Sequence, residues 1–74
     1  SLTTRSSDSL LTAKVKTKLF TLEKFDATRV KVVSENGVVY LMGLLNQQEG
    51  NTAATVASKV GGVQKVVKLF ESPH

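Results

Sequence analysis

The first apolar segment of the chain predicts a helix over about residues 9–22. It contains no proline or glycine, and its leucines, lysines and alanine are good helix formers. Ser7 or Asp8 is expected to cap this helix by accepting hydrogen bonds from its free N–H groups. The preceding residues 1–7 are polar and lack periodicity, which predicts a linker or a disordered N-terminus.

The apolar residues of this helix fall into two stripes on opposite sides. With about 100° between successive residues, one stripe suits a core and contains Leu11, Val15, Leu19 and Leu22. The second stripe contains Leu10, Ala13, Thr17 and Phe20, and it is flanked by Lys14, Lys16 and Lys18. An apolar stripe between cations is typical of a surface that contacts anionic lipid headgroups. The stripe can also have no function, because isolated exposed apolar residues are ordinary and Phe20 can fold back beneath the next loop.

Two β-rich runs around Asn36-Gly37 predict a hairpin over residues 29–45. Asn-Gly favours a two-residue type I′ turn, because both residues take positive φ at low cost. The turn fixes the register and pairs Val33 with Tyr40. The face expected against the helices carries Val30, Val32, Val39 and Leu41, and the opposite face carries Lys31, Val33, Val38, Tyr40 and Met42. The opposite face is an apolar patch, which indicates either an interaction site or a partly exposed sheet without a role.

A second helix and a third strand follow the hairpin. Asn46 and Glu49 have the spacing of a capping box, and Gly61-Gly62 ends the helix. Its apolar face contains Ala53, Val56, Ala57 and Val60. In the strand that follows, periodicity alone selects Val63, Val67 and Leu69 for the core, and it leaves Val66 and Phe70 on the other face. Residues 72–74 are expected to form a tail.

This order of elements predicts an α+β fold, an αββαβ two-layer sandwich. The helical crossover between the second and third strands should be right-handed, which makes those strands parallel. The result is a three-stranded mixed sheet with two helices on one face. A chain of 74 residues holds one domain with a small core.

Composition and charge narrow the choice of function. The chain has ten Lys and Arg against six Asp and Glu, no cysteine, and a single histidine at its last position. We expect no enzyme, no metal and no cofactor, since metal-ligand spacing, a triad base and a phosphate-binding glycine loop are all missing. No apolar run is long enough to span a bilayer, and no signal peptide is recognisable. The basic excess suits an anionic partner, but nucleic acid is not expected, because only Tyr40 offers an exposed aromatic ring on the sheet.

The ordered set of residues resembles the BON domain, a small αββαβ module of the bacterial envelope. The resemblance covers residues 8–71. Its residues are Asp8, Leu11, Val15, Leu19, the run VKVVSENGVVYLMG with Gly37 and Gly43, then Ala53, Ala57, Val60, Gly62, Val63 and Val66. It is most similar to the second domain of dual-BON outer-membrane lipoproteins.

The resemblance implies a periplasmic parent protein that is lipid-anchored at the outer membrane and supports envelope integrity by binding anionic, phosphatidylglycerol-like phospholipid. It implies lipid contact through the first helix. On that helix the two-stripe geometry selects Leu10, Ala13, Lys14, Lys16, Thr17, Lys18 and Phe20 as the contact residues. The resemblance also implies that Val66 and Phe70 face the core. Together with the two-stripe geometry it favours lipid contact over an ordinary exposed helix. The alternative is a protein-interaction module that docks a second BON domain or another envelope partner through Val33, Val38, Tyr40 and Met42.

Overall fold

The computed structural model describes the backbone of residues 2–22 and 25–71, and within these ranges the side chains from residue 8 onward. The elements in chain order are α1 (Leu2–Phe20), the one-turn 3₁₀ helix η1 (Ala27–Arg29), β1 (Val30–Glu35), β2 (Val38–Leu44), α2 (Gln47–Ser58) and β3 (Lys65–Glu71). The predicted αββαβ order is therefore confirmed, with η1 as an addition. The predicted tail at residues 72–74 lies outside the described residues.

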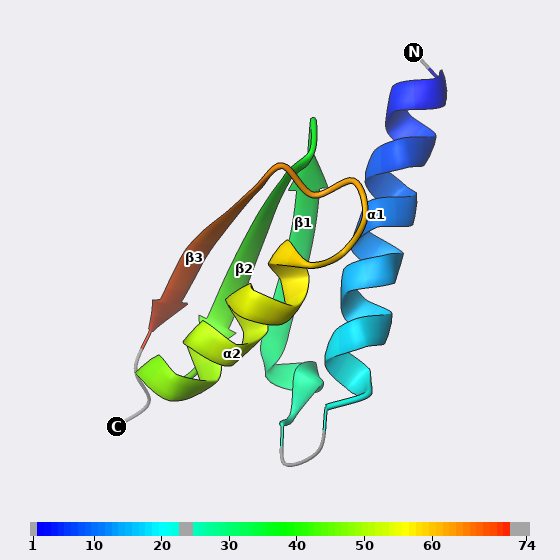
Figure 1. Cartoon of the computed structure of the whole chain (residues 1–74). Coiled ribbons are helices and arrows are strands. Elements are labelled where there is room, and N and C mark those ends of the chain that lie inside the picture. The colour runs from blue at the N-terminus through cyan, green and yellow to red at the C-terminus, as the bar shows by residue number, and fades with distance from the viewer. Residues whose placement is uncertain (1, 23–24, 72–74) are drawn as a thin grey trace.

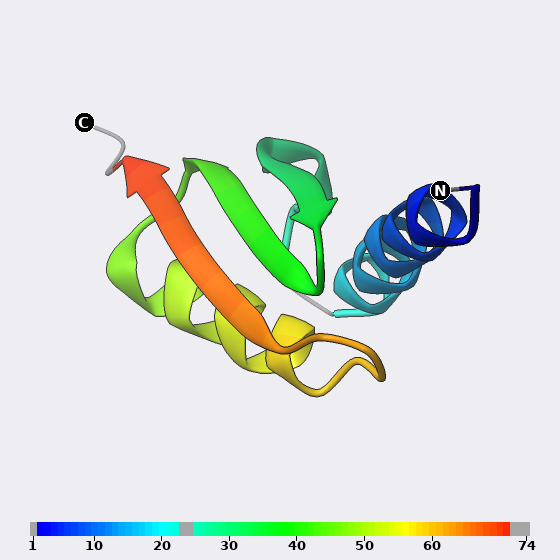
Figure 2. The same cartoon turned by 90° about the horizontal axis from the view of Figure 1, so that it is seen from above.

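The three strands form one mixed sheet in the order β1-β2-β3 (Figure 1). β1 and β2 are antiparallel, and β2 and β3 are parallel. The hairpin has the predicted register, in which Val33 pairs with Tyr40. Asn36 and Gly37 have φ angles of 52° and 81°, as a type I′ turn requires. Seen from above, both helices lie on one side of the sheet and the other side is bare (Figure 2).

The core lies between the two helices and the inner face of the sheet. The predicted core residues of the helices and the hairpin are buried: Leu11, Val15, Leu19, Val30, Val32, Val39, Leu41, Ala53, Ala57 and Val60. Ala27 and Leu45 complete this core. They lie in η1 and just after β2, so the periodic patterns of the neighbouring helix and strands did not include them. Leu22 and Val56 are half-buried and pack against the core.

The core face of β3 is the one that the resemblance implies. Val66 and Phe70 pack against the core, whereas Leu69 is exposed. The parallel register explains this, because Val66 pairs with Val39 on the helix-facing side, and Val67 pairs with Tyr40 on the outer side. The selection made by periodicity is wrong for Val67 and Leu69. It is right for Val63, which packs against the core from the loop before β3.

The first helix is longer than its sequence pattern predicts. α1 begins at Leu2, seven residues before the expected start at Ser9, so the expected cap at Ser7 or Asp8 is wrong. The expected linker at residues 1–7 is helical over residues 2–7, and its place outside the domain stays a prediction. A helix propagates at low cost from packed turns, and residues 2–7 contain no glycine or proline to stop it. The domain boundary at residue 8 stays a prediction.

Candidate functional site

The face of α1 opposite the core is open to solvent, as the two-stripe pattern predicts. We call Leu10, Ala13, Thr17 and Phe20 the outer strip. All four are exposed, and the two large side chains, Leu10 and Phe20, are 57% and 62% exposed. Phe20 is therefore not folded beneath the described part of the following loop. The Thr17 hydroxyl donates to the Ala13 carbonyl at 2.8 Å, so this polar group is satisfied within the helix and the strip is cheaper to desolvate.

The three flanking lysines are exposed as well. Lys14 and Lys18 border the strip on one flank of the helix and Lys16 on the other, because of their positions in the 3.6-residue repeat. Among the described residues the ion pair found joins Arg29 to Asp26 at 3.6 Å, and the three lysines take no part in it. All seven residues expected to contact lipid thus lie together on the exposed surface of α1.

A small cavity opens beside the C-terminal end of the outer strip. It has a volume of about 160 Å³ and lies between the last turns of α1 and the η1–β1 segment, which run side by side in Figure 1. The side chains that line it are Lys16, Leu19, Phe20, Ala27, Thr28, Val30 and Val32. The sequence pattern did not reveal this cavity, because η1 carries no periodic signal.

The outer face of the sheet is a second apolar surface. Val33 is exposed, and Val38, Tyr40 and Met42 are half-buried. The parallel register adds two residues that the sequence interpretation assigned elsewhere: Val67 lies beside Tyr40 and Leu69 beside Met42. Neither helix covers this face (Figure 2). We call Val33, Val38, Tyr40, Met42, Val67 and Leu69 the sheet patch.

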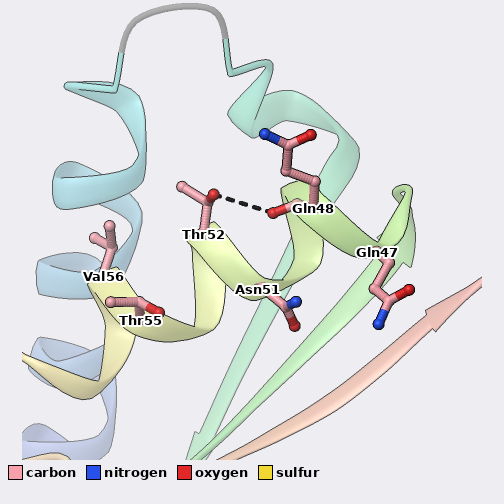
Figure 3. A pocket seen from close by; sticks show the side chains of 6 residues that line it. All are labelled: Gln47, Gln48, Asn51, Thr52, Thr55 and Val56. Carbon is pink, nitrogen blue, oxygen red and sulfur yellow. Dashed lines mark hydrogen bonds between the residues drawn. The ribbon is translucent and has the colours of Figure 1, made fainter.

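A shallow hollow of about 600 Å³ follows the exposed side of α2 (Figure 3). Its lining consists of Gln47, Gln48, Asn51, Thr52, Thr55 and Val56, and the Thr52 hydroxyl donates to the Gln48 carbonyl at 3.0 Å. Amides and hydroxyls offer hydrogen bonds here, but no charged side chain is present. The net positive charge of the chain suits an anionic partner, but this hollow contributes no cation to bind one.

The acidic side chain with a shifted pKa, Asp26, has a structural role. Within residues 2–22 and 25–71 no group of three histidine, cysteine or acidic side chains could hold a metal ion. Asp26 caps η1, and hydrogen bonds from the hydroxyl and the backbone N–H of Thr28, followed by the charge of Arg29, lower the pKa of its carboxyl below the ordinary value. In the same part of the chain no helix has the length and apolarity needed to cross a membrane.

These elements define a small two-layer α+β sandwich with a helix whose apolar strip faces solvent between lysines. The chain belongs to the BON domain family, whose sequence profile matches residues 7–72.

Two curated relatives give the context of this module. The chain is 52% identical over 66 residues to the outer membrane lipoprotein DolP of Haemophilus influenzae. This match covers 89% of the chain and 34% of the relative. It is also 45% identical over 65 residues to the 21 kDa hemolysin of Actinobacillus pleuropneumoniae. That match covers 88% of the chain and 34% of the relative. The chain thus spans about a third of the length of these relatives.

Proposed function

We propose that this BON domain is a non-catalytic module that binds anionic, phosphatidylglycerol-like phospholipid through the outer strip of α1. The observation that carries the proposal is the exposure of Leu10 and Phe20 at the two ends of a strip flanked by lysines. Apolar side chains enter the boundary between headgroups and acyl chains, and cations on either side meet the phosphates.

The relatives support an envelope setting. One of them is named as an outer membrane lipoprotein, and the chain matches about a third of it. The parent protein of this domain is therefore proposed to be lipid-anchored, periplasmic and associated with the outer membrane, where it supports envelope integrity. An anchor of this kind raises the effective concentration of the domain at the membrane, so a weak contact is sufficient.

The energetics require both parts of the surface. Full burial of one large apolar side chain is worth about 1.5–3 kcal/mol, and each lysine close to an anionic surface adds about 1 kcal/mol. Association of a free domain costs about 4 kcal/mol or more in lost translational and rotational freedom. The free energy from the two apolar side chains alone, or from the lysines alone, is about as large as this cost and leaves little for binding. Binding by the isolated domain is therefore expected to depend on both.

The test replaces the two large residues of the strip by serine. We expect the double variant Leu10→Ser/Phe20→Ser to stop sedimenting with phosphatidylglycerol liposomes while its circular dichroism stays unchanged. A matched control, Val33→Ser/Leu69→Ser, removes two exposed apolar residues from the sheet patch and should sediment as the native protein does. Native-like sedimentation of the Leu10/Phe20 variant would refute the proposal.

The sheet patch supports a second candidate function, a protein-interaction module that docks a second BON domain or another envelope partner. The observation in its favour is the continuity of the patch across all three strands, where Val33, Tyr40 and Val67 form one row. Leu69→Glu tests it when introduced into both the isolated domain and its longer parent. Docking in the parent predicts a larger fall of the melting temperature there than in the isolated domain, and equal falls argue against it.

A further inference from the structure

We infer that the cavity between the end of α1 and the η1–β1 segment receives part of one acyl chain of a bound anionic glycerophospholipid, whose phosphate lies at Lys16. The bound segment is the part of the chain next to the glycerol. This inference rests on the proposed function of α1 and adds to it a site for an individual lipid molecule.

The size of the cavity sets how much of a lipid it holds. At about 160 Å³ it is close in volume to an engineered apolar cavity of about 150 Å³ that binds benzene in another protein. It therefore accommodates about six carbon atoms, which is a short segment of one chain. A complete lipid is too large for it, because pockets that enclose whole small molecules measure about 300 Å³ or more.

One part of the cavity lining favours an apolar occupant. Leu19, Ala27, Val30 and Val32 are all buried members of the core and form the apolar part of the lining. A free headgroup placed against these four side chains would find no hydrogen-bond partner among them, whereas a hydrocarbon segment needs none. Phe20 lies at the exposed rim and belongs to the outer strip, so the cavity opens where α1 is proposed to meet the membrane.

Charge at the mouth adds the requirement for an anion. The polar residues of the lining are Lys16 and Thr28. The Thr28 hydroxyl and backbone N–H both donate to the Asp26 carboxylate, which also pairs with Arg29, so this cluster is already satisfied. Lys16 is exposed and outside that cluster. A free phosphate would use Lys16 but not the apolar walls, and a hydrocarbon would use the walls but not Lys16. A phospholipid uses both.

The experiment uses a soluble lipid with six-carbon chains, dihexanoyl phosphatidylglycerol, below its micelle concentration. We expect saturable NMR shifts and intermolecular NOEs from the acyl protons to the methyl groups of Ala27, Val30 and Val32. Glycerol 3-phosphate, which has the anion without the chains, should leave these methyl groups unshifted. NOEs confined to Leu10, Ala13 and Phe20, or no NOEs at all, would overturn the cavity assignment. This measurement needs no variant.

Two variants add to the test. Ala27→Leu fills the cavity without changing a lysine or the outer strip, and it should weaken the affinity for the soluble lipid about tenfold by displacing about two methylene groups. Lys16→Met removes the charge at the mouth and should weaken the same affinity, whereas the remote control Lys65→Met should not. Native affinity in both Ala27→Leu and Lys16→Met would refute the site.

The outcomes also separate this inference from the proposed function. If the native protein sediments with phosphatidylglycerol liposomes but shows no NOEs to Ala27, Val30 and Val32, the outer strip binds the membrane and the cavity assignment is wrong. If the NOEs are present but the protein does not sediment with liposomes, the cavity assignment holds and the proposed membrane contact is wrong.

Discussion

The carboxylate of Asp8 in α1 accepts a hydrogen bond from the backbone N–H of Asn36, across an N···O distance of 3.1 Å. The bond joins the first helix to the hairpin turn, 28 positions further along the chain. One helical turn later, the Thr12 hydroxyl donates to the Ser34 hydroxyl at 2.9 Å. These two bonds add to the core packing of Leu11, Val15 and Leu19, which holds α1 against the sheet and turns the outer strip toward solvent.

Removing the Asp8 carboxylate should loosen this connection. We expect Asp8→Ala to lower the free energy of unfolding by about 0.5–1.5 kcal/mol, the net worth of one hydrogen bond. Asp8→Asn keeps an acceptor oxygen at the same place and should lose less. Urea denaturation followed by circular dichroism measures both. Equal losses in the two variants would contradict a role for the hydrogen bond.

A side chain at position 43 should disrupt the start of the sheet. Gly43 has a φ of 146°, and a Cβ there would lie 2.1 Å from the carbonyl oxygen of Arg29. Strained backbone alone costs about 1–3 kcal/mol, so Gly43→Ala should lower the free energy of unfolding by more than that.

Gly61 provides the matched control for this substitution. A Cβ at Gly61 would meet no other heavy atom within 4 Å. Gly61→Ala should therefore change the free energy of unfolding by less than about 1 kcal/mol, because its main effect is on the entropy of the unfolded chain. If Gly43→Ala and Gly61→Ala melt at similar temperatures, the close approach of Gly43 to the Arg29 carbonyl oxygen does not contribute to stability.

The two faces of the sheet should respond differently to the loss of a leucine. Leu41 is fully buried, whereas Leu69 is 51% exposed on the outer face. Leu41→Ala should cost about 2–5 kcal/mol through lost burial and the cavity it leaves. Leu69→Ala should cost about 1 kcal/mol or less, since less of its surface leaves water on folding. Chemical denaturation distinguishes the two, and a larger loss at Leu69 would reverse the assignment of the faces.

Asp26 should make stability depend on pH in the acid range. Its pKa is lowered in the folded protein, mainly by the hydrogen bonds from Thr28, so the folded state favours the charged carboxylate. The stabilisation is present above the unfolded pKa, near 3.8, and is lost as the pH falls through the lower folded pKa. An NMR titration should give the Asp26 carboxyl a pKa below 3.8. In Thr28→Val the pKa should rise toward that value, and an unchanged pKa would contradict this cause.

The local signals in the sequence predicted the hairpin and most of the core correctly. Asn36-Gly37 determines its own turn, and the turn determines the register of β1 and β2. The face of β3 could not be read from periodicity, because Val67 and Leu69 are as apolar as the core pair Val66 and Phe70. Only the parallel pairing with β2, a contact between distant segments, decides between them.

The candidate site was predictable to a similar extent. Helical spacing alone placed Leu10 and Phe20 opposite the core stripe, but it left open whether Phe20 folds back beneath the next loop, and the structure shows both side chains exposed. Spacing did not predict the cavity beside Phe20, because the cavity needs Ala27 and Thr28 of η1 to lie against the end of α1. The start of α1 at Leu2 was missed because its polar residues carry no amphipathic signal.

The lysines beside the outer strip should matter by position and not only by charge. Each Lys→Glu substitution changes the charge by −2, so the pair Lys14→Glu/Lys16→Glu and the control pair Lys59→Glu/Lys65→Glu both take the net charge from +4 to 0. Only the first pair lies beside the strip. We expect it to abolish sedimentation with phosphatidylglycerol liposomes and the control pair to weaken it slightly, because the attraction falls off within a Debye length of about 10 Å at 0.1 M salt. Binding of the native protein should weaken as salt is raised. Equal losses in the two pairs would mean that net charge alone attracts the domain, and the lysines of α1 would lose their special role.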